Sequence, residues 1–300
     1  MKLTITGATG LIGTQLVEQL KARGDEVTVL SRNPQRAEGS LGVEAVAWEP
    51  LAGPPPTPAL EGRDAVIHLA GEPVAQRWTE KSKTAILASR EIGTRNLVDA
   101  LGSCEPQPAA LISSSAVGYY GKHGDDIVTE ATPAGNDFLA NVCVAWEREA
   151  TRAESLGLRV VLVRTGVVLD ATGGALKTML PPFKAGVGGP VAGGGQYMPW
   201  IHSDDIVGLY LAALDNTDWS GPVNGTAPKP VTNAEFSKAL GRALRRPAIF
   251  PVPAFAIKAL YGEMAEIVTE GQRAIPSVAE ANGYEFVQGD LDQALTSALA

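Results

Sequence analysis

The sequence predicts an α/β fold, a doubly wound parallel sheet that carries a small, mostly helical C-terminal lobe. Two observations support this prediction. In the first half of the chain, short apolar runs alternate with amphipathic helical segments, as expected for a parallel sheet covered by helices on both faces. After Arg164 this pattern gives way to a stretch rich in glycine and proline and then to helical segments broken by prolines, which indicates a smaller second unit.

The expected elements follow one another in a regular order. Six strands are expected, at Lys2–Thr6, Glu26–Leu30, Glu44–Trp48, Ala65–Leu69, Ala109–Ser113 and Leu158–Val163. Five helices are expected, at Leu11–Arg23, Thr79–Leu101, Asp137–Ser155, Asp204–Leu214 and Asn233–Leu244. Residues Gly173–Gly195 show no helical periodicity, so we expect a loop there. Its glycine-rich part, Gly186–Gly195, would either form a lid or one side of a substrate site or lie on the surface without a ligand.

Composition limits the classes of function. Lys and Arg number 25 and Asp and Glu number 33, and the resulting net charge of −8 disfavours a nucleic-acid partner. No apolar stretch is long enough to span a membrane, so no membrane partner is expected. With only Cys104, Cys143 and three histidines, we expect no disulfide framework, no metal site and a reduced, cytoplasmic compartment.

Three glycines follow the first expected strand directly and open the first helix. Gly7, Gly10 and Gly13 have the spacing G-x-x-G-x-x-G, which allows a tight turn, a close backbone approach to a pyrophosphate and close packing of helix on strand. The alternative is a strand–turn–helix unit that uses glycine for geometry alone. We therefore predict a Rossmann-type dinucleotide site, with the backbone of Thr9, Leu11 and Ile12 among its cofactor contacts.

The end of the second strand indicates which dinucleotide is bound. An NAD site commonly has an acidic residue here, whereas this chain has Ser31 and Arg32. A guanidinium binds a 2′-phosphate through two hydrogen bonds, so we predict NADP(H), with Arg32 as a solvated loop residue being the alternative. We expect two domains. The nucleotide-binding domain would consist of residues 1–170, together with residues 200–225, which return to it. Residues 171–199 and 226–300 would form a substrate-binding loop and a C-terminal lobe.

Four segments in this order make the chain resemble a known superfamily. They are Gly7-Ala8-Thr9-Gly10-Leu11-Ile12-Gly13, Asp64-Ala65-Val66-Ile67-His68-Leu69-Ala70-Gly71, Ser113-Ser114-Ser115 and Trp200-Ile201-His202-Ser203-Asp204-Asp205. The chain resembles the short-chain dehydrogenase/reductase superfamily in its extended form, which is similar to nucleoside-diphosphate-sugar epimerases. More narrowly, it resembles the atypical branch of SulA-like "epimerase family" proteins, which join such a unit to a C-terminal domain of unknown function.

The resemblance implies further cofactor contacts. Leu69, Ala70 and Gly71 would pass beside the riboses, Glu72 would accept from a ribose hydroxyl or lie exposed in its loop, and Val167 would lie near the nicotinamide. Arg90 would reach the pyrophosphate from the helix that follows, or else be solvated. Ser113 and Ser114 are also expected beside the cofactor.

The catalytic pattern of that superfamily is incomplete in this chain. The resemblance implies that Ser115 orients a substrate oxygen, but the expected Tyr-x-x-x-Lys pair is absent, and Cys143 and Trp146 stand nearby. Cys143 is expected to be a packing residue. Three side chains are candidates for the missing proton donor. Tyr119 and Tyr120 have the default role of shaping the pocket, and for His202 the alternative is a simple orienting bond to the aspartates that follow it.

Two functions remain open on these grounds. The first is an NADP(H)-dependent oxidoreductase or epimerase-like enzyme that acts on an unknown small polar substrate, nucleotide-sugar-like in character, with a non-standard proton donor. The second is a non-catalytic NADP(H)-binding regulator or sensor, suggested by the missing Tyr-x-x-x-Lys pair. By analogy with related folds, the helices Thr79–Leu101 and Asp137–Ser155 would form the face of a homodimer.

Overall fold

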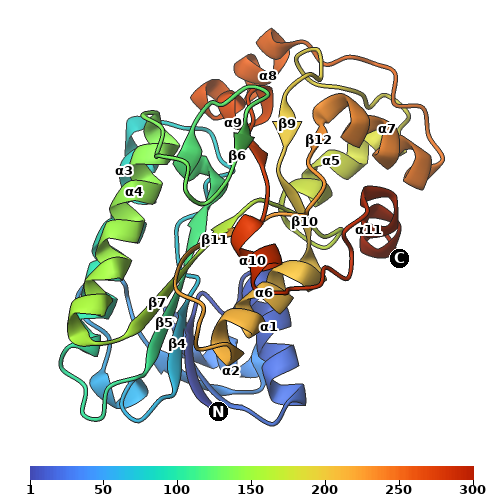
Figure 1. Cartoon of the computed structure of the whole chain (residues 1–300). Helices are drawn as coiled ribbons and strands as arrows, with labels where there is room; N and C mark the ends of the chain where they lie inside the picture. Colours follow the sequence, from blue (N-terminus) through green and yellow to red (C-terminus); the bar gives the residue numbers. More distant parts are fainter.

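The computed structural model describes all 300 residues, and its centre is a seven-stranded sheet (Figure 1). The strand order is β11-β7-β5-β4-β1-β2-β3, and every neighbouring pair is parallel. The strands of this sheet are β1 (Lys2–Thr6), β2 (Glu26–Ser31), β3 (Glu44–Ala47), β4 (Ala65–His68), β5 (Ala110–Ala116), β7 (Arg159–Thr165) and β11 (Gly221–Gly225). The predicted doubly wound fold is therefore confirmed.

Helices cover both faces of the sheet. One face carries α1 (Leu11–Ala22), α2 (Pro34–Leu41) and α6 (Ser203–Asp215), and the other carries α3 (Glu80–Leu101) and α4 (Phe138–Thr151) (Figure 1). Each face has its own apolar core, one of 26 and one of 16 buried residues, so the strands are buried on both sides. None of the helices combines the length and the apolar character that a membrane span requires.

Short-range signals explain where several helices begin. The Thr79 side chain accepts from the backbone N–H of Ser82, and the Ser82 hydroxyl accepts from the backbone N–H of Thr79, which forms a capping box at the start of α3. Asp137 caps α4 from the equivalent position. The helix α2 is not among the predicted elements, although Asn33 followed by Pro34 is a typical cap and first-turn pair.

The C-terminal lobe packs around a third core of 12 buried residues. The helices α5 (Gly174–Lys184), α7 (Asn233–Leu244) and α11 (Leu291–Ala298) line this core. The chain after residue 250 also forms α8 (Ala254–Tyr261), α9 (Glu266–Thr269) and α10 (Ser277–Ala281), and α10 buries Ala279 in the core of the main sheet.

There are also three two-stranded sheets. In the main body β8 (Val167–Leu169) pairs with β10 (Trp200–His202), and in the lobe β9 (Tyr197–Met198) pairs with β12 (Val231–Thr232). The third sheet joins the two parts, because β6 (Ile127–Val128) of the main body pairs with β13 (Arg273–Ala274) of the lobe.

The prediction of a loop over Gly173–Gly195 is wrong for its first half, which forms α5. Leu176, Leu180 and Phe183 are spaced four and three residues apart, and all three are buried in the lobe core. Pro181 and Pro182 obscure this period in the sequence, but both lie in the last turns of the helix. Only residues 185–196 remain as a glycine-rich loop.

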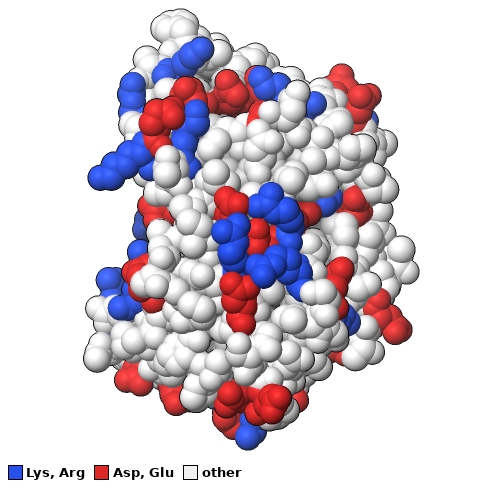
Figure 2. Space-filling model, turned by 90° about the vertical axis from the view of Figure 1, so that its left-hand side faces the viewer, with Lys and Arg blue, Asp and Glu red and all other residues white.

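The outer face of α3 and α4 carries a compact charged cluster, which lies in the middle of the face seen in Figure 2. Its centre is Glu149, whose side chain is only 5% exposed and which forms ion pairs with Arg95, Arg148 and Arg152. Burial alone would raise the pKa of Glu149, but hydrogen bonds from the three guanidinium groups lower this pKa to about 2.

Candidate functional site

The glycine turn lies at the carboxyl end of β1 and brings two loops into contact. Gly7 has φ of +68°, and a Cβ atom there would lie 2.6 Å from the carbonyl carbon of Leu69. At Gly13 a Cβ atom would lie 2.6 Å from the Gly7 carbonyl oxygen. The following helix α1 begins after Gly10 with no side-chain cap, so its first N–H groups have no side-chain partner. This geometry has the two properties of a pyrophosphate cradle, close backbone approach and free amide donors.

A buried histidine fixes the second loop of this turn. His68, at the end of β4, lies 2.7 Å from the Thr6 hydroxyl through Nδ1 and 3.0 Å from the Thr94 hydroxyl through Nε2. The Thr6 hydroxyl also accepts from the backbone N–H of Ala70. Burial, with a contribution from Arg90, lowers the pKa of His68 to about 3. His68 is therefore a neutral core group that holds the Leu69–Ala70 backbone in place.

The end of β2 presents a free cation, which is compatible with a 2′-phosphate site and with a solvated loop residue. Arg32 is exposed and forms neither a hydrogen bond nor an ion pair with the protein. The Ser31 hydroxyl accepts from the backbone N–H of Asn33 at 3.1 Å, which leaves its own hydrogen available to a ligand. The residues that follow Ser31 into α2 are Arg32, Asn33 and Pro34, so this strand end carries no carboxylate that would repel a 2′-phosphate.

Arg90 is held beside the β4 loop and is not a solvated helix residue. Its Nη1 donates to the carbonyl oxygen of Glu72 at 2.9 Å, and its guanidinium lies 4.9 Å from the centre of the Trp146 ring. A Cβ atom on Gly71 would lie only 3.1 Å from the guanidinium carbon. Burial lowers the pKa of Arg90. The guanidinium therefore lies directly against Gly71, at the edge of the sheet where the resemblance places the cofactor.

Ser115 lies inside the sheet, because β5 extends three residues beyond its predicted end. Its hydroxyl is buried and donates to Glu147 at 2.6 Å. Glu147, on α4, also receives two hydrogen bonds of 2.8 Å from Arg164 on β7. Burial alone would lower the pKa of Arg164, but its contacts with Glu147 raise it. The single hydrogen of Ser115 is thus used within the protein, and the hydroxyl has none to donate to a substrate oxygen.

The two predicted tyrosines have different environments. The Tyr120 hydroxyl is buried, donates to Asn224 at 2.6 Å and accepts from Arg164 at 3.0 Å. Burial raises its pKa to about 12. The Tyr119 hydroxyl makes no hydrogen bond with the protein, and its ring centre lies 3.5 Å from the guanidinium carbon of Arg164. Of these two tyrosines, only Tyr119 retains a hydroxyl that a substrate could use.

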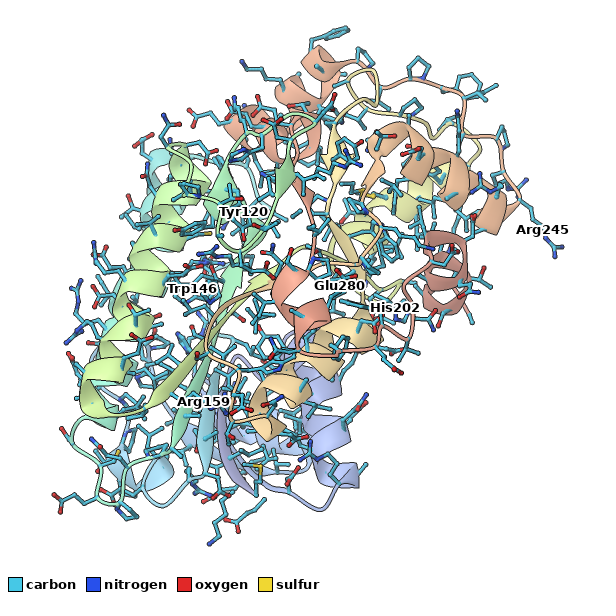
Figure 3. The ribbon with its side chains drawn as sticks, in the orientation of Figure 1. Tyr120, Trp146, Arg159, His202, Arg245 and Glu280 are labelled. Carbon is cyan, nitrogen blue, oxygen red and sulfur yellow. The ribbon has the colours of Figure 1, made fainter.

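The remaining predicted residues mostly have structural roles. Burial raises the pKa of the Cys143 thiol to about 12, as expected of a packing residue. His202 is buried near the start of α6, well apart from Tyr120 and Trp146 in Figure 3, and its Nδ1 accepts from the backbone N–H of Asp204 at 3.1 Å. It caps α6, and this contact with Asp204 is an orienting bond of the kind given as the alternative to an acid or base.

Four predicted cofactor residues lie at or near the same sheet edge. Ser113 is fully buried, and Ser114 shares a hydrogen bond with the Tyr210 hydroxyl, so neither offers a free hydroxyl. Glu72 is half-buried, and its carboxylate accepts from Gln76 at 3.4 Å. Val167 donates its backbone N–H to the Pro199 carbonyl oxygen.

Four residues of this region are missed by sequence reasoning, because their roles depend on distant partners. They are Glu130, Glu147, Arg164 and Asn224, and they form one buried network with Ser115 and Tyr120. Only the interruption of an apolar strand by Arg164 gives a signal, since a charge in a buried strand requires a partner.

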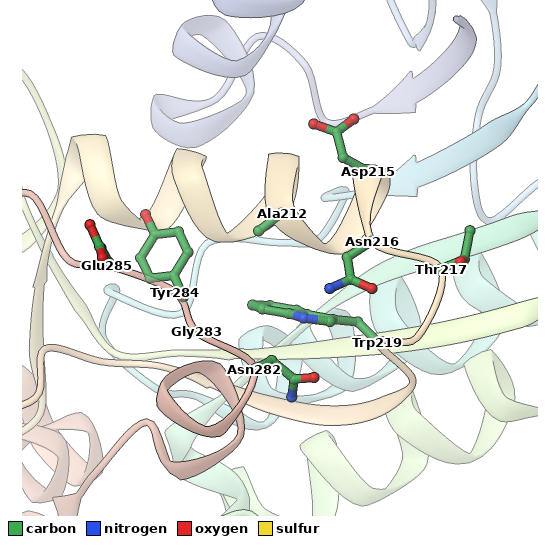
Figure 4. Close-up of a pocket in the computed structure, with 9 residues that line it drawn as sticks. All are labelled: Ala212, Asp215, Asn216, Thr217, Trp219, Asn282, Gly283, Tyr284 and Glu285. Carbon is green, nitrogen blue, oxygen red and sulfur yellow. The ribbon is translucent and has the colours of Figure 1, made fainter.

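A separate hollow of about 680 Å³ lies at the far end of α6 (Figure 4). Asp215, Trp219 and Tyr284 are among its nine lining residues. Because α6 starts beside the carboxyl edge of the sheet and ends at Asp215, this hollow is remote from the glycine turn. Asp215 is engaged there by Arg23 through two hydrogen bonds of 2.9 Å. No group of three or more His, Cys, Asp or Glu is placed to hold a metal ion.

A parallel sheet with a glycine-lined, uncapped helix start at its carboxyl edge defines a Rossmann-type nucleotide-binding fold. The chain belongs to the NAD dependent epimerase/dehydratase family, whose model matches residues 3–224. Residues 252–298 match a domain of unknown function, DUF1731. The resemblance inferred from the order of the motifs is confirmed.

Relatives match along nearly the whole chain. Epimerase family protein SDR39U1 of Homo sapiens is 37% identical to this chain over 305 residues, and the match covers 100% of both proteins. The chloroplastic SDR39U1 homolog of Arabidopsis thaliana is 41% identical, over 95% of this chain and 83% of its own length. Epimerase family protein YfhF of Bacillus subtilis is 37% identical, over 100% of this chain and 98% of its own length.

Solved structures agree with this assignment. The crystal structure of human SDR39U1 with NADPH superposes with a TM-score of 0.89 at 36% identity, over 99% of each chain. The Thermus thermophilus UDP-glucose 4-epimerase complex with NAD has a TM-score of 0.77 at 20% identity, over 99% of this chain and 98% of that one, and supports the fold alone.

Proposed function

We propose that this protein is an NADP(H)-binding, epimerase-like oxidoreductase that acts on a small polar substrate of nucleotide-sugar-like character. The observation that carries the cofactor assignment is Arg32, an exposed guanidinium without a protein partner at the end of β2. The NADPH in the human relative supports the same assignment. A cytoplasmic location is part of this proposal.

The residues present fit such a cofactor. The backbone N–H groups of Leu11 and Ile12 would hold the pyrophosphate at the uncapped start of α1. Ser31 and Arg32 would hold the 2′-phosphate through charge-assisted hydrogen bonds. Arg90 would bind from beside Gly71. When bound, the nicotinamide supplies or accepts a hydride at this edge of the sheet.

We assign the proton donor to Tyr119 rather than to Ser115. Tyr119 has a free hydroxyl, closely follows the carboxyl end of β5 and carries a guanidinium over its ring. Ser115 would act as a positioning residue that orients Glu147, which in turn holds Arg164 over Tyr119. This revises the expectation that Ser115 orients the substrate oxygen.

The assignment is tested by Tyr119→Phe and Ser115→Ala in a screen of NADPH oxidation against carbonyl substrates. The Tyr119→Phe variant should lose about 10²–10⁴-fold in kcat at unchanged NADPH affinity, because the proton donor is removed. The Ser115→Ala variant should lose stability, with a smaller loss in kcat. Equal turnover of Tyr119→Phe and wild type would contradict the role of Tyr119.

A second function is favoured by a specific observation. The helix α4 carries neither Tyr nor Lys, and the hydroxyls of Ser115 and Tyr120 are used within the protein. A regulator or sensor that binds NADP(H) without turnover needs none of these groups. Stereospecific transfer of deuterium from C4-deuterated NADPH to any substrate would exclude this second function.

The cofactor proposal is tested by Arg32→Glu. This variant should weaken NADPH binding by at least tenfold, because a bidentate charge-assisted contact of about 1.5–3 kcal/mol is lost and replaced by repulsion. NADH binding, measured by the same calorimetric titration, should change little. Arg246→Glu, an exposed and unpaired position in the lobe, is the control. An equal loss for both coenzymes would show that Arg32 does not read the 2′-phosphate.

A homodimer through α3 and α4 also stays a proposal. Ile92 and Val144 are each 38% exposed on these helices, beside the cluster centred on Glu149. The cluster pairs its three arginines with three carboxylates, so the face carries little net charge.

A further inference from the structure

The chain between the glycine-rich part of the lobe and β13 contains a segment with very few buried side chains. Neither α8 nor α9 has a buried residue, and only Met264 and Ala265, in the turn between these two helices, are buried. We call residues 254–270 the cover segment. Segments with so few buried apolar side chains open at a low free energy, and active-site lids are drawn from segments of this kind.

The lobe holds the cover segment near both of its ends. Just before it begins, the N–H of Val252 donates to the Pro190 carbonyl oxygen at 2.8 Å, and the Val252 carbonyl oxygen accepts from Ala192 at 2.9 Å. Near its other end, the Val268 carbonyl oxygen accepts from the Gln196 side chain at 2.8 Å. Pro190, Ala192 and Gln196 all belong to the glycine-rich loop. Beyond the cover segment the chain continues into β13, which pairs with β6 of the main body.

The middle of the cover segment rests on the main body, at the place where α3 begins. Arg77, just before α3, donates from Nη1 to the carbonyl oxygens of Ala259 at 3.3 Å and of Leu260 at 3.4 Å, which lie in the last turn of α8. Lys83, near the start of α3, forms an ion pair of 2.9 Å with Glu263. In Figure 1, α8 and α9 accordingly lie at the top of the molecule, between the lobe on the right and α3 and α4 on the left.

The cover segment also packs against the connection between β4 and α3, which carries expected coenzyme contacts. Trp78 and Met264 are buried in one apolar cluster, and Val74 packs against the same cluster. The Trp78 Nε1 donates to the Val74 carbonyl oxygen at 3.0 Å. Val74 lies three residues after Gly71, against which the Arg90 guanidinium lies. The loop that leaves the coenzyme edge is therefore held from one side by the cover segment.

The helix α3 follows β4 and so begins at the carboxyl edge of the sheet, where Rossmann-type folds hold their coenzyme. The cover segment thus crosses from the lobe to the main body at this edge. We infer that it is a lid, which rests on α3 and separates from it when NADP(H) enters or leaves. The inference rests on the proposed function, because it assigns the lid to that same coenzyme site. Since the lid lies within residues 252–298, it gives a role to the part of the chain that matches DUF1731.

The lid is tested by Glu263→Lys, which replaces the attraction at Lys83 by repulsion at an exposed position. Stopped-flow fluorescence of NADPH gives the association and dissociation rate constants. Because a lid that opens more often speeds both entry and release, both constants should rise by about threefold or more. Their ratio, the Kd, should change by less than about twofold. A merely structural role of Glu263 would not raise both constants together.

Two further variants serve as controls for charge. The reversed pair Lys83→Glu with Glu263→Lys restores the attraction, so both rate constants should return toward those of wild type. Arg242→Glu breaks an exposed ion pair with Asp292 that lies wholly within the lobe, and it should leave both constants unchanged.

Hydrogen exchange provides a second measurement that needs no coenzyme. The amides of α8 should exchange faster in Glu263→Lys than in wild type, whereas those of β1 should not change. If wild-type protein does not bind NADPH, the proposed function fails, and the exchange of α8 still tests the attachment to α3, with equal exchange overturning it. If NADPH binds and Glu263→Lys leaves the rate constants unchanged, or changes the Kd without raising both of them, the lid is overturned.

Discussion

At the scale of single residues, Glu149 is a buried carboxylate that is paired with cations from more than one element. It lies under three guanidinium groups that come from α3, from α4 and from the turn after α4. Burial opposes its charged form, but the hydrogen bonds from these arginines outweigh burial and lower the pKa to about 2, from an ordinary value of 4.5.

This pKa predicts an acid dependence of stability. A carboxyl whose pKa is lowered by folding stabilises the protein fully above its unfolded value of about 4.5 and loses this contribution as the pH falls toward about 2. Glu149→Gln should therefore be less stable than wild type at pH 7, and the difference should shrink between about pH 4.5 and 2. Urea unfolding across this range measures it, with exposed Glu154→Gln as the control. A difference that is independent of pH would contradict the pairing.

At the scale of elements, the close approach of α1 to the first strand depends on Gly13. A Cβ atom there would lie 2.6 Å from the backbone of Ala8 and of Gly7, so the helix would have to move. Gly39, in α2, has an ordinary helical backbone, and a Cβ atom added there would have no other atom within 4 Å.

Substitution of these two glycines by alanine should therefore have opposite effects on stability. Gly13→Ala should destabilise the protein by about 1–3 kcal/mol and abolish NADPH binding, because overpacking displaces the start of α1. Gly39→Ala should stabilise it by up to about 1 kcal/mol, through better helix propensity. Chemical denaturation and coenzyme titration measure both. Normal NADPH binding by Gly13→Ala would show that the turn tolerates a displaced helix.

At the scale of the whole molecule, Glu130 joins the sheet to the C-terminal lobe. Its Oε1 accepts from the backbone N–H of Asn224 at 3.0 Å and of Val278 at 3.1 Å. Asn224 in turn donates to the Ile275 carbonyl oxygen at 2.9 Å. The lobe is thus bound to the last strand of the sheet by buried polar contacts as well as by apolar packing.

Removal of this carboxylate should lower the local stability of the contact between the lobe and the sheet more than that of the rest of the sheet. Glu130→Ala leaves the buried N–H of Asn224 without an acceptor, at about 1–3 kcal/mol, and also removes the acceptor of the partly buried N–H of Val278. Hydrogen exchange should accelerate at Val278 and Asn224 before it does so in β1, whereas exposed Glu285→Ala should change stability by less than about 0.5 kcal/mol. Uniform acceleration across the sheet would show that the two parts unfold together.

The parts of this molecule that the sequence predicts are those with local signals. The glycine turn, Arg32 and the alternation of strands and helices follow from neighbouring residues, and each lies where it is expected. The Ser115–Glu147 contact spans 32 positions and the Tyr120–Asn224 contact 104, so no local pattern contains them.

The neutral imidazole behind the coenzyme turn has a consequence for acid stress. In the denatured chain His68 would take up a proton near pH 6.5, whereas in the folded interior it stays neutral down to about 3. Between these values each step of acidification weakens the whole native state, yet leaves the contacts from Thr6 to Ala70 unaltered in every molecule that is still folded. Mild acid should therefore lower the fraction of folded molecules. The coenzyme affinity of the molecules that stay folded should not change, because these contacts of the turn are unaltered.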